Sequence, residues 1–199
     1  MAVGVSRPRR PDGIVGGGGS VAAGTKLYTA QDLLAMGSDA RFELDRGVLV
    51  PMSPSGFRHG RVTANVQFAI ENHVRRGGLG RVLAAETGFA LAHDPDIVRA
   101  PDVAFIRTER LPPEGEGYAA IAPDLVVEVV SPGDTAHELE VKVSEYLAAG
   151  VTSVWVLYPR TRTVMIHRAD GVRRLRAADT LDEEPALPGF SCGVADLFA

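Results

Sequence analysis

The sequence predicts a mixed α/β fold, of the α+β kind, in which helices flank a central sheet of mixed strand direction. The middle of the chain alternates helical and strand patterns in the order helix, strand, strand, strand, helix, strand, an order typical of this architecture. The stretch "LVVEVV", residues 125–130, is apolar except for one glutamate, as expected of a strand buried on both faces. The step from this strand through a helix to the strand that ends near residue 158 predicts a right-handed parallel crossover.

The amino-terminal part of the domain is expected to form a short helix, a hairpin and a long helix. The stretch "YTAQDLLAM" has helical spacing, and Thr29 is a suitable N-cap. The stretch "RFELDRGVLVPM" predicts an added hairpin that turns at residues 45–47. Apolar residues at positions i, i+4, i+7, i+8 and i+12 from Val62 predict an amphipathic helix, which Gly77 and Gly78 end.

The rest of the chain is expected to hold strands around one long helix. The stretches "GRVLAAETGFAL", "DVAFIR" and the run 125–130 are predicted strands, and Pro101 introduces the second of them. The sequence Ser-Pro-Gly at 131–133 breaks the third strand, and residues 135–149 are expected to be helical. "SVWVLYP" is the next strand, a carboxy-terminal hairpin turns at 170–171, and "LPGFSCGVADLF" ends in a short helix.

The composition predicts one soluble domain. The chain has 199 residues, 45% of them hydrophobic and 23% charged, which is enough for a sizeable core. Residues 1–25 are rich in glycine, proline and arginine and predict a flexible tail, so residues 26–199 are expected to form the domain. The single cysteine excludes an internal disulfide, and no apolar run is long enough for a signal peptide or a membrane helix. We therefore expect a cytoplasmic protein with no membrane contact.

Glu128 is the residue of the apolar run that requires an explanation. Side chains alternate across a strand, so Glu128 shares one face with Val126 and Val130. A carboxylate at such a place costs several kcal/mol, on the order of the desolvation penalty of an ion, unless a positive charge or a proton compensates it. Asp102, at the start of the preceding strand, would lie close if the two strands are neighbours. Two close carboxylates repel each other, and a divalent cation such as Mg²⁺ removes that repulsion.

Lys142 is a second candidate for compensating Glu128. Only two of the 21 basic residues are lysines, Lys26 and Lys142. Lys142 follows Leu139 by three residues and precedes Tyr146 by four, so it borders the face of the helix that packs on the sheet. Its ammonium group is therefore within reach of the end of strand 125–130.

These residues resemble the PD-(D/E)XK, or restriction-endonuclease-like, nuclease superfamily. In this sequence "PD" is Pro101–Asp102, but the expected Glu-x-Lys is Glu128-Val129-Val130, which lacks the lysine. The chain is most similar to a large bacterial family usually labelled putative restriction endonuclease, in which the lysine has moved to the following helix, where Lys142 stands. The stretches that carry the resemblance run from about residue 41 to 198: "FELDRGVLVPMSP", "RHG", "AETGFAL", "RAPDVAFI", "PDLVVEVVSPGD", "KVSEYLAAGV", "VWVLYP" and "PGFSCGVADLF".

The resemblance implies a restriction-endonuclease-like fold and a Mg²⁺-dependent endonuclease that hydrolyses phosphodiester bonds of DNA, with Mn²⁺ as a substitute metal. Asp102, Glu128 and the Val129 carbonyl would hold the metal. The metal would lower the pKa of a bound water and polarise the phosphate. Lys142 would orient that water or stabilise charge in the transition state. The resemblance further implies a homodimer, in which two sites cut two strands.

Three further positions are characteristic of the family. Glu86 would complete the metal shell or hold a water beside it. His59 would contact phosphate or act as an acid or base. Glu43 belongs to the predicted hairpin, at the rim of the site.

Other interpretations of the same residues stay open at this stage. Glu86 would face solvent if its strand lies at an edge, and Lys142 would be solvated beside Glu138. Asp124 is interpreted as a turn residue. The net charge of −4 argues against a surface that binds nucleic acid non-specifically, although it leaves a local basic groove open. The alternatives to a DNA endonuclease are a non-catalytic interaction module with the same fold and a metal-dependent hydrolase of small phosphoesters.

Overall fold

The structure, a computed structural model, describes residues 26–37, 41–113, 115, 117–182 and 184–199, so the predicted tail at 1–25 lies outside the described residues. The helices are α1 (Ala30–Ala35), α2 (Phe57–Gly77), the 3-10 helix η1 (Thr108–Arg110), α3 (Ala136–Ala148) and α4 (Val194–Leu197). The strands are β1 (Phe42–Asp45), β2 (Val48–Pro51), β3 (Gly80–Ala84), β4 (Phe89–Ala92), β5 (Ile97–Arg99), β6 (Val103–Arg107), β7 (Leu125–Val129), β8 (Ser153–Tyr158), β9 (Thr163–Arg168), β10 (Gly171–Arg176), β11 (Thr180–Leu181) and β12 (Cys192–Gly193).

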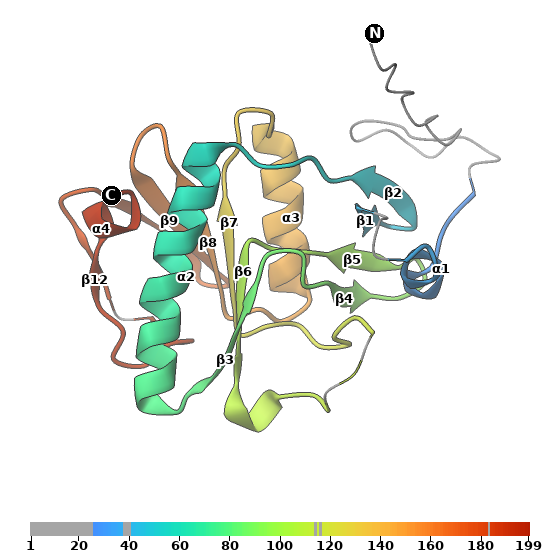
Figure 1. Ribbon diagram of the computed structural model, residues 1–199, viewed down its shortest axis with the longest axis horizontal. Helices are drawn as coiled ribbons and strands as arrows, with labels where there is room; N and C mark the ends of the chain where they lie inside the picture. The colour runs from blue at the N-terminus through green and yellow to red at the C-terminus, as the bar shows by residue number, and fades with distance from the viewer. Residues whose placement is uncertain (1–25, 38–40, 114, 116, 183) are drawn as a thin grey trace, which may run out of the picture.

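The central sheet has six strands in the order β10-β9-β8-β7-β6-β3. Strands β7 and β8 are parallel and joined through α3, whereas the other neighbouring pairs are antiparallel. Helices α2 and α3 cover opposite faces (Figure 1): Val127 belongs to the core beneath α2, and Val126 to the core beneath α3. The predicted mixed sheet flanked by helices, with its parallel crossover and its alternating faces of β7, is confirmed.

A second sheet of four antiparallel strands, in the order β2-β1-β5-β4, stands beside the central one. The predicted amino-terminal hairpin is β1–β2, but it is part of this sheet rather than an isolated addition. The prediction of one strand across "GRVLAAETGFAL" is wrong, because β3 and β4 belong to different sheets. The chain turns between them, where Glu86 has φ of 72° and the Thr87 amide donates to the Ala84 carbonyl.

Local sequence determines how the two long helices begin and end. Thr135 and Glu138 form a capping box at the start of α3, in which each side chain accepts from the other residue's backbone amide. Helix α2 buries Val62, Val66, Ile70 and Val74, one residue per turn, and ends where Gly78 adopts the left-handed conformation at φ of 61°. In Figure 1 both helices begin at the upper edge of the central sheet, where β7 ends. None of the helices in the described residues has the length and apolar character that crossing a bilayer demands.

Candidate active site

Two carboxylates oppose each other on neighbouring strands at the upper edge of the central sheet. Val103 of β6 pairs with Val127 of β7, so the next position along this ladder sets Asp102 opposite Glu128. Directly opposed side chains in an antiparallel pair have Cβ atoms about 5 Å apart. Glu128 faces α3, as the alternation along the strand predicts, and is only 8% exposed.

Backbone atoms of β7 complete this corner. Asp102 Oδ2 accepts a 2.7 Å hydrogen bond from the amide of Val129. The same ladder sets Pro101 opposite Val129, and proline has no N–H with which to bond the Val129 carbonyl. The Asp102 side chain thus accepts the hydrogen bond of the Val129 amide. The Val129 carbonyl lacks the backbone N–H that a residue other than proline at position 101 would offer it.

Glu128 lies against α3, where two side chains approach its Oε1 atom. The hydroxyl of Tyr146, which is fully buried, donates a 2.7 Å hydrogen bond to Oε1, and Lys142 Nζ lies 3.9 Å from the same oxygen. Burial raises the pKa of Glu128 to about 7, an effect that Lys142 opposes and the carboxylates of Asp102 and Glu43 increase. The surroundings of Glu128 therefore compensate its negative charge only in part near neutral pH.

Lys142 is closer to Glu43 of β1 than to Glu128. Its Nζ lies 3.1 Å from both carboxylate oxygens of Glu43. Burial alone would lower the pKa of Lys142, but Glu128 and Glu43 together raise it. Burial would likewise raise the pKa of Glu43, but Lys142 and Arg99 lower it below its usual value. Both groups therefore stay charged, and the ammonium is shared between two acids.

Arg99 and Glu145 extend this network, and the sequence analysis missed both. Arg99, 3% exposed, donates to Glu43 Oε2 at 3.1 Å and to Glu145 Oε2 at 2.8 Å. Arg99 was missed because β5 is a three-residue strand without a clear pattern. Glu145 carried a usable signal, since it follows Lys142 by three residues and so lies on the same side of α3.

His59 reaches the site from the first turn of α2. Its Nε2 lies 3.2 Å from Asp102 Oδ2, and its Nδ1 lies 3.4 Å from the hydroxyl of Thr63. The hydrogen bond to Asp102 raises the pKa of His59 against the opposing effect of burial. This partner favours the protonated imidazolium, which is a proton donor and a phosphate ligand.

Glu86 is not part of the site among the described residues. It lies in the turn between β3 and β4, its side chain is 59% exposed, and it forms an ion pair with Arg41. The structure thus brings Asp102, Glu128, Lys142 and His59 together and leaves Glu86 apart, with the positive φ of its turn as the physical reason. Asp124 is more than the turn residue of the sequence interpretation: it is 2% exposed and accepts a 2.7 Å hydrogen bond from Arg110.

The donor set fits Mg²⁺ better than zinc. No group of three or more His, Cys, Asp or Glu side chains in the described part of the chain is arranged to hold a metal. Magnesium needs less, because one or two carboxylates with waters suffice. Asp102 and Glu128 each use one oxygen in the protein contacts described above, Oδ2 and Oε1, and the Val129 carbonyl adds a neutral oxygen. The raised pKa of Glu128 has the same implication, because a cation would offset both the burial of this carboxylate and the repulsion from Asp102 and Glu43 that raise it.

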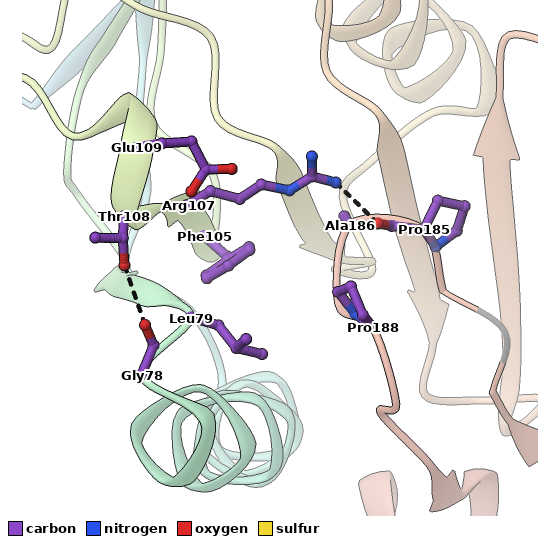
Figure 2. Close-up of a pocket in the computed structure, with 9 residues that line it drawn as sticks. All are labelled: Gly78, Leu79, Phe105, Arg107, Thr108, Glu109, Pro185, Ala186 and Pro188. Atoms are coloured by element: carbon purple, nitrogen blue, oxygen red, sulfur yellow. Dashed lines mark hydrogen bonds between the residues drawn. The ribbon is translucent and has the colours of Figure 1, made fainter.

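Two pockets of the described residues lie away from this site. The pocket in Figure 2, of about 340 Å³, is lined by Phe105, Arg107 and Pro185 among others, and Arg107 extends across it to the Pro185 carbonyl. Arg107 ends β6 whereas Asp102 precedes its start, a separation of roughly 17 Å along an extended strand. A second pocket of about 370 Å³ lies between α2 and the chain around Phe190. Neither includes a residue of the site.

The fold and this constellation define a restriction-endonuclease-like protein. In the central sheet and its two long helices the chain order is α2, β3, β6, β7, α3 and β8, with β4 and β5 of the second sheet inserted after β3. Asp102, Glu128 and Lys142 lie together at one end of these strands. The chain belongs to the Uma2 family, which is described as "Putative restriction endonuclease" and whose sequence profile matches residues 28–195.

A solved structure supports the fold. A structure described as a "putative nuclease belonging to DUF820" from Anabaena variabilis ATCC 29413 matches with a TM-score of 0.74 and 19% identity, over 85% of this chain and 97% of that chain. The DrdV–DNA complex matches with a TM-score of 0.33 and 16% identity, over 69% of this chain and 13% of that chain. This likeness is too low to support the fold or the function. No protein of curated function matches the sequence.

The unusual pKa of Glu128 predicts how the stability of the metal-free protein depends on pH. The pKa of Glu128 is about 7 in the folded state and above its ordinary value of 4.5. As the pH rises, Glu128 therefore loses its proton at a lower pH in the unfolded chain than in the folded protein. The contribution of Glu128 to the free energy of unfolding consequently falls until the pH has passed 7. Glutamine does not titrate, so the stability of Glu128→Gln minus that of wild type should increase by on the order of 1–3 kcal/mol when the pH is raised from about 5 to about 8. Urea unfolding in the presence of EDTA at both pH values measures this difference. A difference that stays constant with pH would contradict the prediction.

Proposed function

We propose that the protein is a Mg²⁺-dependent endonuclease that hydrolyses phosphodiester bonds of DNA. The observation that carries the proposal is the approach of Lys142 to within 3.9 Å of Glu128, which is itself opposite Asp102. Two acids and a lysine at a sheet edge are the groups that metal-assisted phosphodiester hydrolysis needs, although the lysine comes from a helix rather than from the strand. The choice of DNA is supported by the description of the Uma2 family.

In this proposal each residue has a separate task. Asp102, Glu128 and the Val129 carbonyl would hold the cation, which when bound lowers the pKa of a water and polarises the phosphate. Lys142, kept protonated by two acids, stabilises the negative charge that develops on the phosphate or orients the attacking water. His59, whose pKa is raised by the hydrogen bond to Asp102, binds phosphate or donates a proton to the leaving oxygen.

Plasmid nicking tests the proposal. We expect the wild-type protein to convert supercoiled DNA to open circles with Mg²⁺ or Mn²⁺ and not with EDTA. Asp102→Asn should reduce the rate by about 100-fold, because the amide keeps the size of the side chain but loses the charge that holds the metal. Asp170→Asn, in the exposed turn between β9 and β10, is the matched control. Absence of cleavage by wild type, or equal cleavage by Asp102→Asn, would exclude the assignment and favour a non-catalytic module.

The homodimer stays a prediction. Phe57 and Phe68 of α2 are 89% and 71% exposed, which leaves apolar surface on this helix, and a double-strand break would require two sites.

Cleavage of a small phosphodiester in preference to plasmid DNA would identify the protein as a hydrolase of small phosphoesters instead.

A further inference from the structure

Lys142 is held between two acids that compete for it, and the more distant of them is a candidate metal ligand. Its Nζ is 3.1 Å from both oxygens of Glu43 but 3.9 Å from Glu128 Oε1. An ammonium in direct contact with Glu128 would neutralise this carboxylate and occupy the space of a cation. The balance between Glu43 and Glu128 therefore decides whether Glu128 is free to bind one.

Glu43 is fixed by the second sheet. Leu44 of β1 pairs with Val98 of β5, so Glu43 and Arg99 occupy opposed positions on the two strands. Arg99 Nη1 donates to Glu43 Oε2 at 3.1 Å, and the backbone amide of Ala100 donates to Glu43 Oε1 at 3.1 Å. With Glu43 itself only 3% exposed, its carboxylate has little freedom to follow Lys142.

Arg99 is fixed in turn by α3. Arg99 Nε and Nη2 lie 2.8 and 2.6 Å from Glu145 Oε2. Arg46 Nη1 lies 2.9 Å from the other carboxylate oxygen, Glu145 Oε1, and forms an ion pair with it that lacks hydrogen-bond geometry. Lys142 and Glu145 lie one turn apart on α3, and Glu43 and Arg99 lie opposite each other on the sheet. Positive and negative side chains thus alternate where α3 packs against the second sheet, in the order Lys142, Glu43, Arg99 and Glu145.

We infer that Glu43, Arg99 and Glu145 are positioning residues, which hold the ammonium of Lys142 away from Glu128 so that Glu128 stays open to a divalent cation. The inference rests on the proposed function for the identity of the cation. It assigns the second sheet a specific task, because without Glu43 the nearest anion for Lys142 is Glu128. Lys142 would then move onto Glu128, and a metal would have to displace it.

Metal binding without DNA tests this inference directly. We expect Glu43→Gln to weaken the binding of Mn²⁺, followed by the electron paramagnetic resonance signal of free Mn²⁺, by about 10- to 100-fold. Adding Lys142→Met to Glu43→Gln removes the competing ammonium and should restore wild-type affinity. Lys142→Met alone should bind Mn²⁺ at least as tightly as wild type. Glu140→Gln, at an exposed position of α3, is the matched control and should bind as wild type does.

Three outcomes would overturn the inference. The first is wild-type affinity in Glu43→Gln, and the second is weak binding that Lys142→Met does not rescue, which would make Glu43 itself a ligand. The third is the absence of Mn²⁺ binding by wild type. If circular dichroism shows that Glu43→Gln does not fold, Glu145→Gln replaces it. This variant loosens Arg99 and Arg46 but leaves the contact between Glu43 and Lys142 in place, so it should give a smaller loss that Lys142→Met again rescues. A protein that binds Mn²⁺ in this pattern but cuts no DNA would refute the proposed function and leave the inference standing.

Discussion

Replacing Lys142 with methionine is expected to lower the rate of plasmid nicking by about 1,000-fold, the scale on which enzymes lose rate when one preorganised donor to the transition state is removed. Methionine is one atom shorter than lysine but keeps an unbranched apolar stem, so it removes the charge with little change in shape. Glu43 keeps its partners Arg99 and Ala100, so the fold should survive. Single-turnover nicking at saturating Mg²⁺ measures the loss, because it separates chemistry from metal binding.

Lys26→Met is the natural control, since Lys26 is the only other lysine of the chain. It is exposed and lies over the ring of Tyr28, with Nζ 4.4 Å from the ring centroid. Its replacement should leave the nicking rate unchanged. A Lys142→Met protein that nicks at more than a tenth of the wild-type rate would mean that the ammonium has no direct role in the chemistry.

Replacing Arg99 with methionine is expected to destabilise the protein by about 3–5 kcal/mol, the usual cost of breaking a buried ion pair from one side. The variant leaves Glu43 and Glu145 as buried carboxylates, 3% and 6% exposed, without their shared cation. Arg99 helps to hold the pKa of Glu43 below its usual value, so this pKa should rise in the variant, and the loss of stability should shrink as pH falls and Glu43 takes up a proton. Urea unfolding at about pH 8 and about pH 5 measures both effects.

Arg81→Met provides the comparison, because Arg81 is an exposed arginine on the edge strand β3 whose hydrogen bond goes to the neighbouring Gly80 carbonyl. Its replacement should change stability by less than about 0.5 kcal/mol. If Arg99→Met costs no more than this, the network around Arg99 contributes nothing net to folding. A loss that grows as the pH is lowered would contradict the assignment of the two carboxylates as the cause.

Local patterns predicted the residues of the site that lie on regular elements. The alternation of side chains along β7 predicted the face of Glu128, and helical spacing predicted that Lys142 borders the sheet. The Pro-Asp pair before β6 identified Asp102, and strand order then brought it opposite Glu128. These predictions need only the period of an element and the identity of its neighbours.

What the sequence did not predict depends on pairing between distant segments. Strand β5 has three residues and no alternation to detect, so Arg99 was not recognised as the partner of Glu43. The resemblance to the family placed Glu86 near the metal, and the stretch around it was predicted as a single strand. A left-handed residue in a turn leaves no periodic signal, and it divided that stretch between two sheets.

The contact between Glu43 and Lys142 joins residues 99 positions apart. Closing a loop of that length in a flexible chain costs on the order of 4 kcal/mol of entropic free energy. The single contact between Glu43 and Lys142 does not offset this cost. The pair forms only after the strands between them have assembled and α3 has packed. During synthesis Glu43 leaves the ribosome long before Lys142, so a nascent chain carries the Pro-Asp pair without the lysine. The charged site therefore exists only when both sheets and α3 are in place, and an unfinished or partly unfolded chain lacks it.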